Sequence, residues 1–93
     1  MAKLFWRIQG YDSLKLIFEQ RIPYGSVTER QMQELLKALA AKAGLDFEEI
    51  VGAYAKKRTK LANDLLEVHH DARHHTWMCG ENPHFAARII KQP

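Results

Sequence analysis

Two short apolar runs open the chain. Residues 3–9 and 14–22 are rich in aromatic and branched side chains, and the four residues between them, Gly-Tyr-Asp-Ser, are typical of a turn. This pattern predicts two strands joined as a β-hairpin. Pro23 is expected to close the second strand, since proline has no backbone N–H to donate to a neighbouring strand.

Two capping boxes then predict two consecutive helices. Thr28 and Gln31 are spaced so that each side chain can bond the other's backbone N–H, and a helix is expected over residues 28–43. Asp46 and Glu49 repeat this spacing, so a second helix is expected to start directly after the first. The two helices should therefore meet at a tight corner.

Each predicted helix carries one apolar stripe at helical spacing, and both stripes are expected to pack into the core. The first stripe is Met32, Leu35, Leu36 and Leu39, and the second is Phe47, Ile50, Val51 and Tyr54. An alternative continues the second helix through residues 59–68, because apolar residues recur every seven positions from Phe47. The weak helix formers Asn63 and Asp64 favour the shorter helix followed by a strand.

Three short extended segments are predicted in the remainder, over residues 65–70, 74–79 and 84–91, with turn residues between them. The element order is then ββααβββ. This order predicts an α+β two-layer sandwich, in which a mainly antiparallel five-stranded sheet carries two helices on one face. A chain of 93 residues is one domain's worth, so residues 1–93 are expected to form a single domain.

The composition, 46% hydrophobic and 27% charged, is that of a folded domain rather than of a disordered or low-complexity chain. The only cysteine, Cys79, cannot form an internal disulfide bond, and no long apolar run predicts membrane insertion. We therefore expect a cytoplasmic protein that does not associate with membranes.

Turn lengths predict which side chains of the C-terminal strands share a face. A four-residue turn would place Cys79 opposite His84, and a three-residue turn would place His69 opposite His75. The predicted inner face then consists of Leu66, Val68, Met78, Phe85, Ala87 and Ile89. The predicted outer face consists of Glu67, His69, His75, Trp77, Cys79, His84 and Arg88.

The net charge of +3 is too small to indicate nucleic-acid binding by itself, so the clustering of cations matters. The candidate binding surface consists of Lys56, Lys57, Arg58, Lys60, Arg73, Trp77 and Arg88. Its cations could contact phosphates, and its indole ring could stack on a base. The plainer alternative is a solvated helix end that is stabilised by nearby cations.

All five histidines lie between His69 and His84, which suggests a metal site as an alternative. The candidate ligands are Glu67, His69, His75 and His84, with Cys79 as a further possibility. Imidazole and carboxylate groups suit a divalent transition metal, but the set lacks the spacing of the strong zinc motifs. Solvated or hydrogen-bonded histidines are the simpler interpretation.

Cys79 opposite His84 could also form a pair of thiolate and imidazolium, although no oxyanion-hole motif accompanies it.

The apolar residues Trp6, Ile8, Ile17 and Trp77 are expected to share an uncovered face. Self-association through that face, or through a free edge strand, would remove them from water and predicts a homodimer. A monomer that shields them with its own turns is the alternative.

The function expected from the sequence is that of a small interaction module without catalytic activity or cofactor. Its helices are accounted for by capping and core packing, which leaves the basic, histidine-bearing and tryptophan-bearing sheet face as the feature available for binding. A protein partner is preferred slightly over single-stranded nucleic acid. The alternative is a metal-dependent enzyme built on the histidine cluster.

Overall fold

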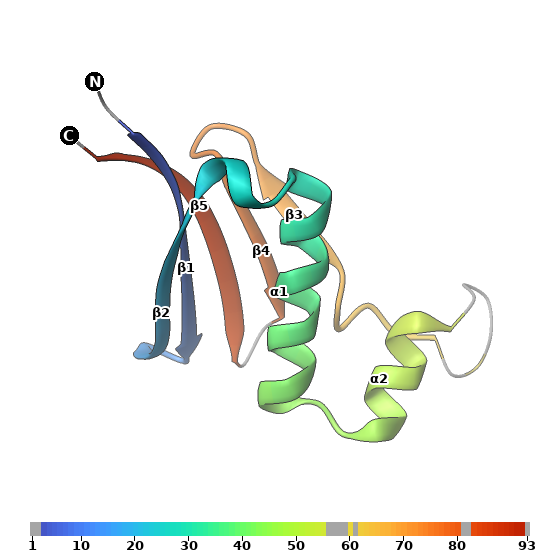
Figure 1. Ribbon diagram of the computed structural model, residues 1–93. Coiled ribbons are helices and arrows are strands. Elements are labelled where there is room, and N and C mark those ends of the chain that lie inside the picture. The colour runs from blue at the N-terminus through green and yellow to red at the C-terminus, as the bar shows by residue number, and fades with distance from the viewer. Residues whose placement is uncertain (1–2, 56–59, 61, 81–82, 93) are drawn as a thin grey trace.

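The computed structural model describes residues 3–55, 60, 62–80 and 83–92. The elements are β1 (Lys3–Asp12), β2 (Lys15–Pro23), the short 3-10 helix η1 (Tyr24–Ser26), α1 (Glu29–Gly44), α2 (Phe47–Tyr54), β3 (Val68–Asp71), β4 (Thr76–Gly80) and β5 (His84–Gln92) (Figure 1). The predicted order ββααβββ and the α+β fold with a five-stranded antiparallel sheet are confirmed.

The sheet joins the two ends of the chain. Its strand order is β2-β1-β5-β4-β3, and every neighbouring pair is antiparallel. β1 and β5 pair from Lys3 opposite Gln92 to Tyr11 opposite His84, which brings the chain ends together in Figure 1. The predicted N-terminal hairpin and C-terminal meander are therefore fused into one sheet through β1 and β5.

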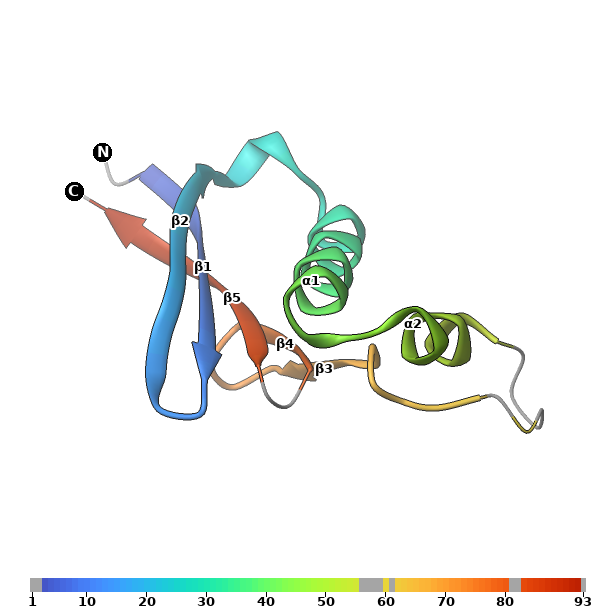
Figure 2. The ribbon, with the colours of Figure 1, turned by 90° about the horizontal axis from the view of Figure 1, so that it is seen from below.

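The helix α1 covers one face of this sheet, and Figure 2 shows both helices on the same side. Alternate residues of β1, among them the buried Trp6 and Ile8, point toward α1, which contributes the buried Met32 and Leu36. Trp6 also meets Trp77 of β4 edge to face, with ring centroids 5.3 Å apart. The core thus lies between α1 and the inner face of the sheet.

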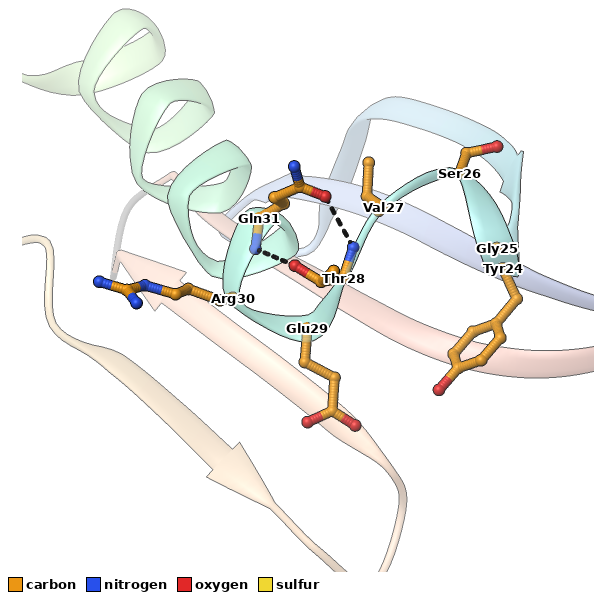
Figure 3. A pocket seen from close by; sticks show the side chains of 8 residues that line it. All are labelled: Tyr24, Gly25, Ser26, Val27, Thr28, Glu29, Arg30 and Gln31. Atoms are coloured by element: carbon orange, nitrogen blue, oxygen red, sulfur yellow. Dashed lines mark hydrogen bonds between the residues drawn. The ribbon is translucent and has the colours of Figure 1, made fainter.

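The predicted capping box at the start of α1 is confirmed. The Thr28 Oγ1 atom accepts a hydrogen bond from the backbone N–H of Gln31 at 3.1 Å, and the Gln31 Oε1 atom accepts one from the N–H of Thr28 at 2.9 Å (Figure 3). These bonds satisfy donors that have no partner within the helix.

α2 also begins with its predicted capping box, formed by Asp46 and Glu49. Its apolar stripe is not buried, however, and that prediction is wrong: the side chain of Phe47 is 79% exposed and that of Tyr54 is 60% exposed. The reason is that α2 turns its Gly52 side inward. The backbone N–H of Asn63 donates to the Gly52 carbonyl at 3.0 Å, which fastens α2 to the segment before β3.

The longer second helix is also wrong, because α2 ends at Tyr54 and residues 62–67 are not helical. Residues 56–59 and 61 lie outside the described residues. In the part of the chain that the structure describes, no helix combines the length and the apolar character needed to cross a lipid bilayer.

Candidate functional site

The register of the C-terminal strands differs from the predicted one by one residue between β4 and β5 and by three residues between β3 and β4. Gly80, not Cys79, lies opposite His84, because Gly80 adopts a left-handed φ of 88° and the strand continues one position further before turning. At the other turn Thr76 lies opposite Asp71, so that the turn has four residues and includes His75 at a φ of 48°. The changes at the two turns therefore place each β4 side chain on the face opposite the predicted one.

This shift removes Trp77 and Cys79 from the predicted outer face. Trp77 is 4% exposed and Cys79 is fully buried, so both belong to the core. Met78, which was predicted to point inward, lies on the outer face instead, opposite His69 of β3. The Trp77 ring is also stacked against the His70 ring at 4.2 Å, which occupies one of its faces. Trp77 is therefore not available for stacking on a ligand.

The predicted metal ligands are not brought together. His69 lies opposite Met78 and not opposite His75, which sits in the β3–β4 turn. His84, at the start of β5, stacks on Tyr11 with ring centroids 5.4 Å apart. Glu67 is exposed and precedes β3. Among the residues that the structure describes, no three His, Cys, Asp or Glu side chains are grouped so that they could hold a metal ion.

The Cys79 thiol lacks the surroundings of a nucleophile. It lies opposite Phe85 rather than opposite His84, so the predicted thiol and imidazole pair is not formed. Burial raises the pKa of the Cys79 thiol, and Lys37 offsets this only in part. Burial among apolar groups favours the neutral thiol, so the arrangement fits a core residue.

A second histidine contact has a structural role in the β3–β4 turn. The Nδ1 atom of His74 lies 2.7 Å from the Oδ2 atom of Asp71, and this hydrogen bond lowers the pKa of the Asp71 carboxyl. Asp71 Oδ1 also accepts from the backbone N–H of Arg73 at 3.1 Å. Both carboxylate oxygens thus hold the turn closed.

The predicted basic surface is only partly assembled. Lys56, Lys57 and Arg58 lie outside the described residues. Lys60 lies before β3, whereas Arg73 lies in the turn after it, so β3 separates them. That turn adjoins β5, since the N–H of Ile89 donates to the His75 carbonyl at 3.4 Å. Arg88 is exposed on the outer face of β5.

Arg88 belongs to a surface feature that was not predicted from the sequence. Arg7 of β1 lies opposite Arg21 of β2 on one side and opposite Arg88 of β5 on the other. We call these three residues the arginine row. It runs on the outer face from the edge strand β2 to the central strand β5, and neighbouring strands are only ~4.8 Å apart. Like charges directly opposite one another destabilise a sheet, so this arrangement has an energetic cost for the isolated protein.

One carboxylate offsets the row only in part. Arg7 Nη2 lies 3.2 Å from Glu19 Oε2, and Gln9 Nε2 donates to the same oxygen at 2.7 Å. The hydrogen bonds from Gln9 and Arg7 lower the pKa of Glu19, which therefore stays charged. Arg21 and Arg88 are exposed, and neither forms an ion pair with another described residue.

Aromatic side chains lie on both sides of the arginine row, directly beside it at Phe5 and beyond Gln9 at Tyr11. Phe5, which lies next to Arg7 on this face, is opposite Pro23 and Ile90. At the other end of β1, Tyr11 carries the stacked ring of His84. We call the whole surface the open face, and it consists of Phe5, Arg7, Gln9, Tyr11, Glu19, Arg21, Met78, His84, Ala86, Arg88 and Ile90.

The open face lies on the side of the sheet away from α1 and α2 (Figure 2). The predicted apolar patch on an uncovered face is wrong in most of its members, because Trp6, Ile8 and Trp77 are buried beneath α1. Only Ile17 remains, with 46% of its surface exposed. The alternation of Phe5, Arg7, Gln9 and Tyr11 along β1 was the signal that could have located the open face.

A shallow hollow also lies at the start of α1, where Tyr24 and Thr28 line it (Figure 3). The capping box already uses the donors of Thr28 and Gln31 there, so the hollow offers a ligand little beyond the ordinary helix start.

Comparison with known proteins gives no match, whether to a protein-family model, to a curated protein or to a solved structure. The fold and the site alone therefore define the class, which is a small α+β domain with one helix-covered and one open sheet face.

Proposed function

We propose that the protein is a non-enzymatic binding module whose open face takes the backbone of a single-stranded nucleic acid. The observation that carries this proposal is the arginine row, in which three guanidinium groups cross adjacent strands and share one nearby carboxylate. A bound phosphate chain would relieve the repulsion between them, and contacts of this kind supply most of the affinity in sequence-independent binding.

The aromatic borders of the row support the same ligand. Side-chain rows on a strand repeat at roughly 6.8 Å, so Phe5 lies one repeat from Arg7 and the Tyr11–His84 stack lies two repeats away on the other side. Each could receive an unpaired base. Stacking of bases on aromatic side chains, next to cations that follow the backbone, is the usual means by which open sheet faces hold single strands.

A protein partner is the second candidate, and the exposed stripe of α2 favours it. Phe47, Val51 and Tyr54 lie on one face of that helix and are 79%, 38% and 60% exposed. Apolar side chains at this spacing are typical of a helix that docks in a groove. The stripe is separate from the open face, so the two candidates concern different surfaces.

The proposal includes a homodimer and a cytoplasmic location. The dimer no longer rests on an apolar patch, and the free edge of β2 supports it instead. The cytoplasmic location is consistent with a chain whose one cysteine, Cys79, provides no internal disulfide bond that would require an oxidising compartment.

The experiment is a binding titration with a fluorescent oligo-dT at several salt concentrations. The double variant R21A/R88A should bind at least tenfold more weakly at low salt. Its slope of log affinity against log salt should fall by about 1.4, because each phosphate contact on a single strand contributes ~0.7. Circular dichroism should confirm that the variant is folded.

The matched control is R30A/K42A, which removes the same charge from exposed positions on α1. It should keep most of the affinity. If the control loses as much as R21A/R88A, or if the wild-type protein does not bind, the open face is not a nucleic-acid site. A third variant, F47S/Y54S, should leave oligo-dT binding unchanged.

A further inference from the structure

The strand β2 forms a long free edge of the sheet. It pairs with β1 on one side only, and it contains no proline before its last residue, Pro23. The opposite edge, β3, has four residues, whereas β2 has nine. A free edge presents a row of backbone donors and acceptors that a further strand can pair with.

The side chains of β2 restrict what can pair there. Between Phe18 and Ile22 the strand is regular, with Phe18 and Ile22 on the α1 side and with Glu19 and Arg21 on the open face. A register shift between Gly10 and Tyr11 interrupts the alternation before Phe18. The regular segment is therefore short, and it carries both signs of charge on one face.

A second copy of this strand fits the segment in one register. A two-fold axis perpendicular to the sheet keeps each face on its own side, so only residues on the same face can lie opposite each other. Centring the axis on Glu19 would oppose two carboxylates, and centring it on Arg21 would oppose two guanidinium groups. Centring it on Gln20 instead places Glu19 of each copy opposite the partner's Arg21, which is favourable.

The α1 side of the same register is complementary as well. Phe18 would lie opposite the partner's Ile22, and both residues are only half-buried in the single chain. Aromatic side chains paired across strands with β-branched ones stabilise antiparallel sheets. Each half of the contact thus contains one ion pair and one apolar pair.

We propose that β2 pairs antiparallel with β2 of a second copy, centred on Gln20, so that two five-stranded sheets become one continuous sheet. Glu19 then lies between Arg7 of its own chain and Arg21 of the partner. The two arginine rows come to lie on the same side of the continuous sheet. The dimer itself does not depend on what the open face binds, although a nucleic acid that spanned both rows would bind the dimer more tightly than the monomer.

Charge reversal tests the register by sedimentation equilibrium without nucleic acid. E19R opposes two arginines at each ion-pair position and R21E opposes two glutamates, so each variant alone should dimerise at least tenfold more weakly than the wild-type protein. An equimolar mixture should recover the dimer, because the arginine introduced in one variant then lies opposite the glutamate introduced in the other. A wild-type protein that stays at 10.8 kDa up to 500 µM overturns the proposal, as do variants that dimerise normally and a mixture that stays monomeric.

Cross-linking provides a second test that does not alter charge, in case E19R fails to fold after the loss of the Arg7 contact. Gln20 is exposed and would lie opposite its own copy, where Cβ atoms ~4.5 to 5.5 Å apart approach the distance needed for a disulfide bond. Q20C should therefore oxidise to a covalent dimer. The control A43C, at an exposed position near the end of α1, should not. Equal cross-linking of the two variants, or none in Q20C, contradicts the pairing.

The outcomes separate the dimer from the proposed function. Oligo-dT binding measured below the dimerisation constant reports on the open face of the monomer, whereas sedimentation and cross-linking report on β2 alone. Oxidised Q20C should bind long oligo-dT more tightly than reduced Q20C if both proposals hold.

Discussion

The two faces of the sheet are built from neighbouring residues but affect the stability of the fold in opposite directions. On β1 the fully buried Trp6 is followed by Arg7, whose side chain is 40% exposed and lies opposite two further arginines. The inner face gains free energy by removing apolar surface from water, and the outer face loses some by placing like charges together. The alternation along a single strand thus separates the face that stabilises the fold from the face that we propose for binding.

The largest expected effect on stability comes from removing a large side chain from the inner face. W77A should lower the free energy of unfolding by about 3 to 5 kcal/mol, because it leaves a cavity beside Trp6 in a fully buried cluster. Urea unfolding measures the change. A loss below about 1 kcal/mol would mean that Trp77 is not a core residue and that the register of β4 is incorrect.

A smaller effect should follow from overfilling the same face. A Cβ atom at Gly10 would overlap the ring of Phe85, so G10A should cost about 1 to 3 kcal/mol of stability. G25A is the matched control, because nothing lies within 4 Å of a Cβ at Gly25. The control should change the free energy of unfolding by less than about 0.5 kcal/mol.

The outer face should respond in the opposite sense. At protein concentrations below the dimerisation constant, where the Arg21 contact proposed across the dimer is absent, R21A/R88A removes like charges from the row. It should then change stability by no more than about 0.5 kcal/mol, with stabilisation as the expected sign. The same variant should lose affinity for oligo-dT, as described above. A loss of several kcal/mol in urea would show that the arginine row supports the fold.

The smallest expected effect is on how the free energy of unfolding depends on pH. The raised pKa of Cys79 means that the folded state keeps this proton when the unfolded state loses it. Stability from this group is therefore complete below the unfolded thiol pKa of ~8.5 and decreases as the pH rises above it. C79A should reduce this decrease, measured by urea unfolding between pH 7 and 10. Rapid alkylation of the native wild-type thiol near pH 7 would contradict its burial.

Features that depend on local sequence were predictable. The capping boxes of α1 and α2 use residues only three positions apart, so Thr28 and Asp46 mark the helix starts whatever the helices later contact. The N-terminal hairpin is local in the same sense. By contrast, an apolar stripe shows that a helix can be buried but not what will bury it, and Phe47 of α2 is exposed for this reason.

The candidate site could not be predicted, because it depends on backbone geometry and on distant pairing. His75 adopts a positive φ that nothing in the sequence indicates, and with Gly80 it moves Trp77 from the outer face to the inner one. The arginine row needs Arg7 and Arg88 side by side, which only the pairing of β1 with β5 provides. The alternation along β1 indicates that Arg7 lies on the face opposite Trp6, but it does not indicate that Arg88 lies beside Arg7.

The pairing of β1 with β5 has a consequence for how the protein is made. Among the five strands of the sheet, β1 is synthesised first and becomes an inner strand, and its second neighbour, β5, is synthesised last. One side of β1 therefore has no strand partner until β5 has been synthesised, and contacts between such distant segments form slowly. Deleting β5 would remove the central strand of the sheet and would separate β1 and β2 from β3 and β4.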